Sequence, residues 1–149
     1  TDFGRVGIDV CYDTEFPLYA RAQVEAGARV ILVPSCTDTE AGANRVRVGC
    51  QARALENQVY VACAVTAGEA PWSPALDVNT GTATIYTPID RGFPPDGILA
   101  RAQTGADWAI GELDLAALDA FKLDAQVANA NDWMAQLRPL VVNAAVETL

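Results

Sequence analysis

The 149-residue chain contains no histidine, and its four cysteines include no Cys-x-x-Cys pair. We therefore expect no zinc or other metal site and no cofactor, because imidazoles and paired thiolates are the usual zinc ligands. Nineteen acidic residues outnumber ten basic ones, which gives a net charge of −9. This balance argues against nucleic acid or an anionic membrane as a partner, since both attract basic surfaces. Small molecules and other proteins are the expected partners.

Long apolar runs are also missing, and no charged-then-apolar leader opens the chain. Neither a membrane span nor secretion is therefore expected. The cysteines are expected to be free thiols of a reducing compartment, which predicts a cytoplasmic protein. The first residue is threonine and a strand is predicted almost at once, so we expect a portion of a longer gene product.

What is present predicts a folded α/β chain, with residues 1–149 forming a single domain or part of one. Apolar segments at 6–10, 29–34 and 59–66 predict strands, and helices are expected at 17–26 and 43–58. This alternation indicates right-handed βαβ units. The second half is expected to be more antiparallel: a loop at 67–81, strands at 82–87, 97–103 and 107–114, the last two joined near Gly105, a helix at 114–122 and a tail at about 123–149.

Cys11 follows the first predicted strand in the run GIDVCYDTEFP, residues 7–17. Pro17 suits the first turn of a helix, so the thiol lies at a strand-to-helix turn. A helix N-terminus favours the thiolate form, which is the nucleophile. Catalysis is therefore plausible, and a small buried apolar side chain is the alternative.

The predicted helix at 43–58 carries Arg53 on a side with small residues. A buried guanidinium needs an acidic partner, and we expect Asp13 to form a bidentate pair with it that fixes the Cys11 turn. Glu56 is a second nearby acid that could instead face solvent, and a surface-exposed Arg53 is the alternative. One side of this helix comprises Val46, Gly49, Cys50, Arg53, Ala54 and Asn57. The opposite side, with Val48, Ala52 and Leu55, would be covered by the same subunit or by a second one.

Several short motifs occur in a fixed order: Cys11-Tyr12-Asp13 with Phe16-Pro17, Gly27-Ala28, Pro34-Ser35 and Arg53-Ala54-Leu55-Glu56-Asn57-Gln58. Together they resemble the carbon–nitrogen hydrolases of the nitrilase superfamily, continuously to Gln58 and more loosely to Leu118. The stretch with Arg45 and Arg47 is similar to amidase-like branches. The resemblance implies the C-terminal half of a nitrilase-like α-β-β-α sandwich.

The resemblance also implies a Glu-Lys-Cys set that hydrolyses non-peptide carbon–nitrogen bonds, in an amide more than in a nitrile. Cys11 falls on the nucleophile, which would form a thioester acyl-enzyme, and the backbone N–H of Tyr12 would donate to the oxyanion. In the family the Glu and Lys precede the Cys, and only ten residues precede Cys11. The chain alone is therefore expected to be incompetent, with a complementary N-terminal half supplying both groups.

Two positions depart from the family pattern. Lys122, the single lysine, matches no catalytic position and is interpreted as a solvated charge near a helix end. Leu18 stands where the family usually has an acid, which affects a minor contact.

Substrate contacts are expected at the carboxyl edge of the sheet, where Ser35, Cys36 and Thr37 follow the second strand. Cys36 could approach Cys11 or be a buried bystander, and Trp72 could wall the pocket or lie in an exposed loop. Cys50 and Cys63 are assigned to core packing. The tail is expected to pack on its own or a neighbouring subunit of a homo-oligomer through Trp133, Met134, Leu137, Leu140, Val141 and Val142.

Two other functions remain open. The chain could be a non-catalytic binding or assembly module on the same scaffold, or a thiol redox sensor that uses Cys11 and Cys36. An upstream Glu and Lys would favour the hydrolase, and a Cys11–Cys36 disulfide under mild oxidation would favour the sensor.

Overall fold

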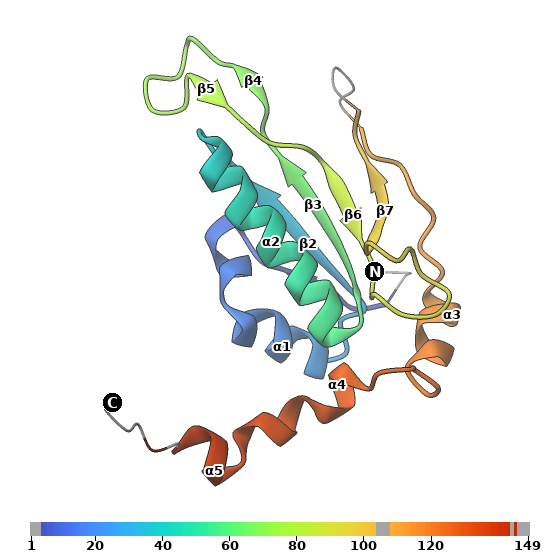
Figure 1. Ribbon diagram of the computed structural model, residues 1–149. Helices are drawn as coiled ribbons and strands as arrows, with labels where there is room; N and C mark the ends of the chain where they lie inside the picture. The colour runs from blue at the N-terminus through green and yellow to red at the C-terminus, as the bar shows by residue number, and fades with distance from the viewer. Residues whose placement is uncertain (1–3, 104–107, 144, 146–149) are drawn as a thin grey trace.

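A five-stranded mixed sheet organises the chain in the computed structural model, which describes residues 4–103, 108–143 and 145. Its strand order is β1-β2-β3-β6-β7, where the strands are β1 (Val6–Ile8), β2 (Val30–Ser35), β3 (Tyr60–Val65), β6 (Thr84–Tyr86) and β7 (Ile98–Arg101). The first three strands are parallel, and β6 and β7 add antiparallel. The predicted α/β class and its change to antiparallel pairing are both confirmed (Figure 1).

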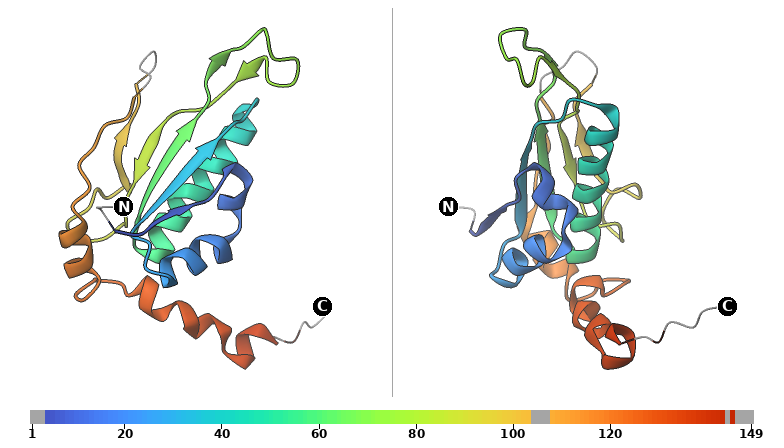
Figure 2. Two further views of the ribbon diagram at one scale, coloured as in Figure 1. Left: turned by 180° about the vertical axis from the view of Figure 1, so that it is seen from behind. Right: turned by 90° about the vertical axis from the view of Figure 1, so that its left-hand side faces the viewer.

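The helices α1 (Pro17–Glu25) and α2 (Glu40–Asn57) lie side by side on one face of this sheet (Figure 2). After α1 the backbone turns at Gly27, whose φ of +96° a side chain rarely adopts. Helix α2 begins three residues earlier than predicted, because the Thr39 hydroxyl accepts the N–H of Gly42 at 3.1 Å and caps the helix at Glu40.

The segment after β3 differs most from expectation. Short strands β4 (Gly68–Glu69) and β5 (Val78–Asn79) form a two-stranded ribbon within the predicted loop. Residues 108–114 form no strand, whereas Gly105 and residue 107 lie outside the described residues. Helix α3 (Leu115–Phe121) forms as predicted, because the Asp114 carboxylate accepts the N–H of Ala117 at 2.8 Å.

The two faces of the sheet have opposite surroundings, and neighbouring residues of β2 show it. Ile31 and Val33 point into the core beneath α2 and are 0% and 1% exposed, whereas Leu32 between them is 40% exposed. Ile8 on β1 is 58% exposed in the same way. Near Val30 and Tyr60, α3 covers this second face through Leu118, whereas no described helix covers the part around Ile8 and Leu32 (Figure 2). We call this uncovered part the open face, and one α layer on one sheet is what half of an α-β-β-α sandwich provides.

Beyond α3 the tail comprises α4 (Asn129–Asp132), the 3₁₀ helix η2 (Trp133–Leu137) and α5 (Pro139–Val142). It docks on its own chain: the Gln58 side chain bonds Val127 and Ala130, and Arg21 lies 5.0 Å from the Trp133 ring centre. The described apolar tail side chains stay largely exposed, namely Met134, Leu137, Val141 and Val142. The Leu140 side chain lies outside the described residues. Packing on a neighbouring subunit stays a prediction.

No described segment covers the outward side of α2 either. Val48 and Leu55 are 54% and 37% exposed, so coverage of this side by the same subunit is wrong. Coverage by a second subunit stays a prediction. None of the described helices combines the length and the apolar character that crossing a membrane requires.

Candidate active site

Cys11 lies where β1 ends and a 3₁₀ helix, η1 (Cys11–Glu15), leads into α1. Its backbone has φ +49°, a left-handed conformation that is uncommon for a residue with a side chain. The partly exposed thiol donates a weak hydrogen bond to the backbone carbonyl of Cys36, with Sγ 3.6 Å from the oxygen. Cys11 therefore lies at a strand-to-helix turn, as predicted. The strained backbone of this turn holds the thiol at the carboxyl edge of the sheet.

Tyr12 follows the thiol on the same turn. Within the described part of the chain, its backbone N–H has no acceptor. Its ring is 62% exposed and packs edge-on against Phe16, at 4.9 Å between ring centres. A free N–H next to a nucleophile is the donor that an oxyanion needs.

The expected pair between Asp13 and Arg53 is wrong. The Asp13 carboxylate turns back on its own loop and accepts the N–H of Val10 at 3.0 Å. Arg53 instead pairs with Glu56 one turn along α2, with Nε 2.6 Å from Oε1, and donates from Nη1 to the Thr14 carbonyl at 2.7 Å. Asp13 and Arg53 therefore each bind a group close to them in the sequence and not each other. Arg53 contacts the Cys11 turn only through the Thr14 carbonyl oxygen among the described residues.

Arg53 nevertheless lies on the buried side of α2 that the periodicity predicted. All six members of that side are buried: Val46, Gly49, Cys50, Arg53, Ala54 and Asn57. At Gly49 an added Cβ would lie 2.8 Å from the Thr14 carbonyl oxygen. The small residues therefore let η1 approach α2 closely.

Asp9 is a buried acid that sequence reasoning missed. It is 1% exposed, its Oδ1 accepts a hydrogen bond from the Gln23 amide, and its Oδ2 has no partner in the described part of the chain. Burial raises the pKa of this carboxyl, with a smaller contribution from nearby Asp13. The sequence could have revealed Asp9, because it lies two residues after Gly7 and side chains two apart along a strand point to the same face, here the face toward the helices.

A polar cluster adjoins the Cys11 thiol at the carboxyl edge of β2 and β3. The thiol of Cys36 lies 3.2 Å from the Asn79 side-chain oxygen, and Thr66 donates to that same oxygen at 2.8 Å. Thr37 donates to the Thr80 carbonyl. Asn79 was missed because it lies in the ribbon, which was predicted to be an irregular loop, whereas Thr66 was predicted as the last residue of the strand at 59–66 and was given no role.

The remaining candidate residues form no hydrogen bond with the Cys11 thiol within the described part of the chain. Ser35 is buried with its hydroxyl unpaired among the described residues, and Trp72 is 80% exposed in the turn between β4 and β5. Trp72 lines none of the described cavities. Cys50 and Cys63 are in the core as expected, where their mutual hydrogen bond and then burial raise the pKa of Cys50.

Lys122 caps the C-terminus of α3, and burial lowers the pKa of its amine, so it is less solvated than expected. Among the described residues, the charged groups near it are Asp119, Arg21 and Arg29, none of which belongs to the Cys11 turn. The part of the chain that the structure describes has no group of three acidic, cysteine or histidine side chains able to hold a metal ion.

Comparison with known proteins agrees with the motifs around Cys11. The family model "Carbon-nitrogen hydrolase" matches residues 1–122. Probable hydrolase YhcX of Bacillus subtilis is 39% identical over 116 residues, which cover 77% of this chain and 23% of the relative. Deaminated glutathione amidase of Bos taurus is 38% identical over 115 residues, covering 77% and 32%.

A solved structure agrees with the fold. Nit3 of Saccharomyces cerevisiae, described as a member of branch 10 of the nitrilase superfamily, superposes with a TM-score of 0.66 at 27% identity. The superposition covers 83% of this chain and 42% of Nit3. The chain thus spans less than half the length of each of these relatives. Sequence, fold and matched motifs place the chain in the carbon–nitrogen hydrolase family of the nitrilase superfamily.

Proposed function

We propose that Cys11 is the nucleophile of an amidase and forms a thioester with the acyl part of its substrate. The observation that carries this proposal is the turn itself: a partly exposed thiol on a left-handed residue, followed by the unpaired N–H of Tyr12. The amidase among the relatives favours an amide as the substrate over a nitrile.

The proposed chemistry has two steps. The Cys11 thiolate attacks the amide carbonyl carbon, and the oxyanion accepts the Tyr12 N–H. The C–N bond then breaks, the amine leaves with a proton, and a thioester remains. Water attacks the thioester, releasing the carboxylic acid and restoring the thiol. Proton transfer in both steps needs an acid–base group, and we assign it to the Glu and Lys that the family resemblance implies.

We propose further that a complementary portion of the family fold carries those groups and packs on the open face. A groove of about 470 Å³ on this face is lined mainly by apolar side chains, with Ile8, Leu32, Ala62, Ile85 and Trp108 among them. The chain spans only 23% to 42% of the relatives' lengths, so the rest of such a fold is a natural occupant. Its place before Cys11 in the sequence stays a prediction, as does homo-oligomer formation.

An activated ester tests the nucleophile without the missing groups, because its leaving group needs no protonation. Incubation with p-nitrophenyl acetate followed by peptide mass mapping should find one acetyl group, on Cys11. The Cys11→Ser variant should lose it, whereas Cys36→Ser, a matched change of the neighbouring partly exposed thiol, should keep it. Acetylation at another site, or none in the wild type, would overturn the proposal and favour the binding or assembly module.

A further inference from the structure

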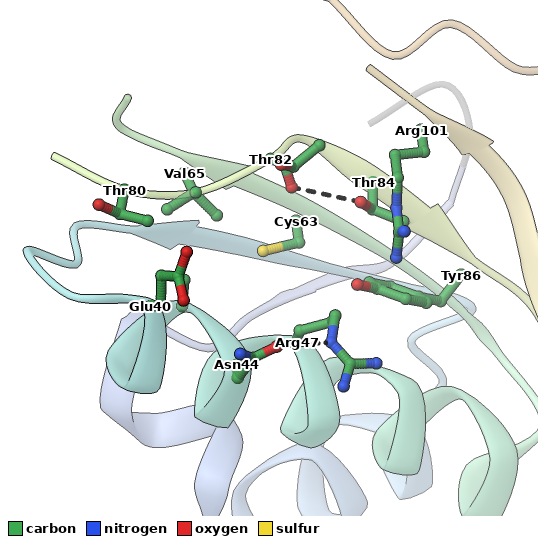
Figure 3. Close-up of a pocket in the computed structure, with 12 residues that line it drawn as sticks. Glu40, Asn44, Arg47, Cys63, Val65, Thr80, Thr82, Thr84, Tyr86 and Arg101 are labelled. Atoms are coloured by element: carbon green, nitrogen blue, oxygen red, sulfur yellow. Dashed lines mark hydrogen bonds between the residues drawn. The ribbon is translucent and has the colours of Figure 1, made fainter. Parts of the chain in front are cut away.

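A second cavity lies on the helix-covered face, away from the Cys11 turn. It has a volume of about 450 Å³ and lies between α2 and the strands β3, β6 and β7 (Figure 3). Cys63 lies on its floor, and Cys11 is not among its lining residues. Nothing in the proposed reaction uses this space.

Two arginines line this cavity from opposite walls. Arg47 comes from α2, and Figure 3 shows Arg101 reaching from β7 toward it. Arg47 donates to the Asn44 side chain at 3.2 Å, and Arg101 forms no hydrogen bond or ion pair within the described residues, although its charge lies near Tyr86. Both guanidinium groups therefore have donors left for a ligand.

The lack of acidic partners is notable because acids are abundant in this chain. Other arginines form ion pairs with carboxylates, namely Arg21, Arg29, Arg45, Arg53 and Arg91. Among the described residues, neither Arg47 nor Arg101 does so. Two uncompensated guanidinium groups at one cavity produce a local positive field in a protein of net charge −9.

Buried hydroxyl groups complete this end of the cavity. Thr84 and Tyr86 are 2% and 1% exposed and line the wall beneath Arg101. Burial raises the pKa of Tyr86, so its hydroxyl keeps its proton and can donate. Glu40 lines the opposite end near Thr80 (Figure 3), which disfavours an extended polyanion that would fill the whole cavity.

We propose that this cavity binds a small molecule through one compact oxyanion group, a carboxylate or a phosphate, held between Arg47 and Arg101. The planar guanidinium of arginine can donate two parallel hydrogen bonds to two oxygens of either group, and the Tyr86 hydroxyl adds a neutral donor. The site is separate from the proposed acyl-enzyme and does not depend on it.

Binding of inorganic phosphate and of acetate to the purified protein, measured by calorimetry at constant ionic strength, tests the site. Saturable binding of at least one probe is expected, and the comparison between them separates phosphate from carboxylate recognition. Arg101→Gln and Arg47→Gln should each weaken binding by about tenfold, the usual effect of losing a charge-assisted hydrogen bond. Arg45→Gln is the matched control, because Arg45 lies on the same helix, pairs with Glu15 and does not line this cavity.

Circular dichroism of each variant shows whether it is folded, and Arg101→Lys provides a second variant that keeps the charge. Arg101→Lys should bind more tightly than Arg101→Gln and more weakly than the wild type. The proposal is overturned if neither probe binds saturably, or if Arg45→Gln weakens binding as much as the two cavity variants do.

Discussion

The two faces of the sheet differ in what covers them: α1 and α2 lie on one, whereas α3 packs only on the Val30 and Tyr60 end of the other among the described residues. On β2, Val33 is 1% exposed beneath α2, and Leu32 beside it is 40% exposed on the open face. On the covered face Arg53 binds Thr14 and Glu56, whereas Oδ2 of the buried Asp9 has no partner among the described residues. Within the described residues the chain therefore builds one α layer on one face of the sheet, and coverage of the open face by a partner stays a prediction.

The largest effect is expected from a charge placed on each face in turn. Val33→Asp buries a carboxylate without a partner and should lower the free energy of unfolding by about 4 kcal/mol or more. Leu32→Asp is the matched change one residue earlier and should cost less than about 1 kcal/mol in this chain. Urea denaturation of both variants measures the contrast. Equal losses of unfolding free energy in the two variants would show that Leu32 is as buried as Val33.

The next largest loss of stability is expected when Arg53, which binds the Thr14 carbonyl of the Cys11 turn, is replaced. Arg53→Met leaves the Thr14 carbonyl without its donor and Glu56 with only the Asn57 amide at 3.5 Å, which should cost about 3 kcal/mol. In double-mutant cycles, Arg53→Met with Glu56→Gln should show coupling of about 1 kcal/mol, and Arg53→Met with Asp13→Asn less than about 0.5 kcal/mol. Stronger coupling to Asp13 would restore the pair that the sequence suggested.

Some features of the covered face were predictable from the sequence, and the partner of Arg53 was not. Parallel strands and the buried side of α2 follow from the apolar period of the chain, and both were predictable. The partner of Arg53 was not, because Asp13 and Glu56 are both acids within reach and only the local backbone decides between them. The β4–β5 ribbon and its Asn79 were missed because Gly and Pro in that segment indicate a turn without revealing the pairing around it.

A third prediction concerns Asp9, the acid buried on the covered face. Burial raises its pKa in the folded protein, so folding favours the protonated form. Its contribution to stability is therefore complete below about pH 3.9, the ordinary aspartate pKa, and is lost as the pH rises through the folded value. Asp9→Asn should raise the free energy of unfolding at pH 7 by about 1 kcal/mol. The gain should disappear at pH 3, and a loss at pH 7 would contradict the burial argument.

The smallest effect is expected on the outward side of α2, which no described segment covers. Val48 is 54% exposed there, so Val48→Ser should change the free energy of unfolding by less than about 0.5 kcal/mol. Thermal unfolding at two protein concentrations checks this. A larger loss that grows with concentration would show that a second subunit covers this side.

We propose that the turn between β1 and α1 makes Cys11 a nucleophile, and competitive alkylation measures this reactivity. The protein is treated with limiting iodoacetamide, and the four cysteines are mapped by peptide mass. Cys36 is the internal control, because it is partly exposed like Cys11 but lies outside the turn. We predict stoichiometric labelling of Cys11 at least about tenfold faster than of Cys36. Labelling spread evenly over the four thiols would contradict the account.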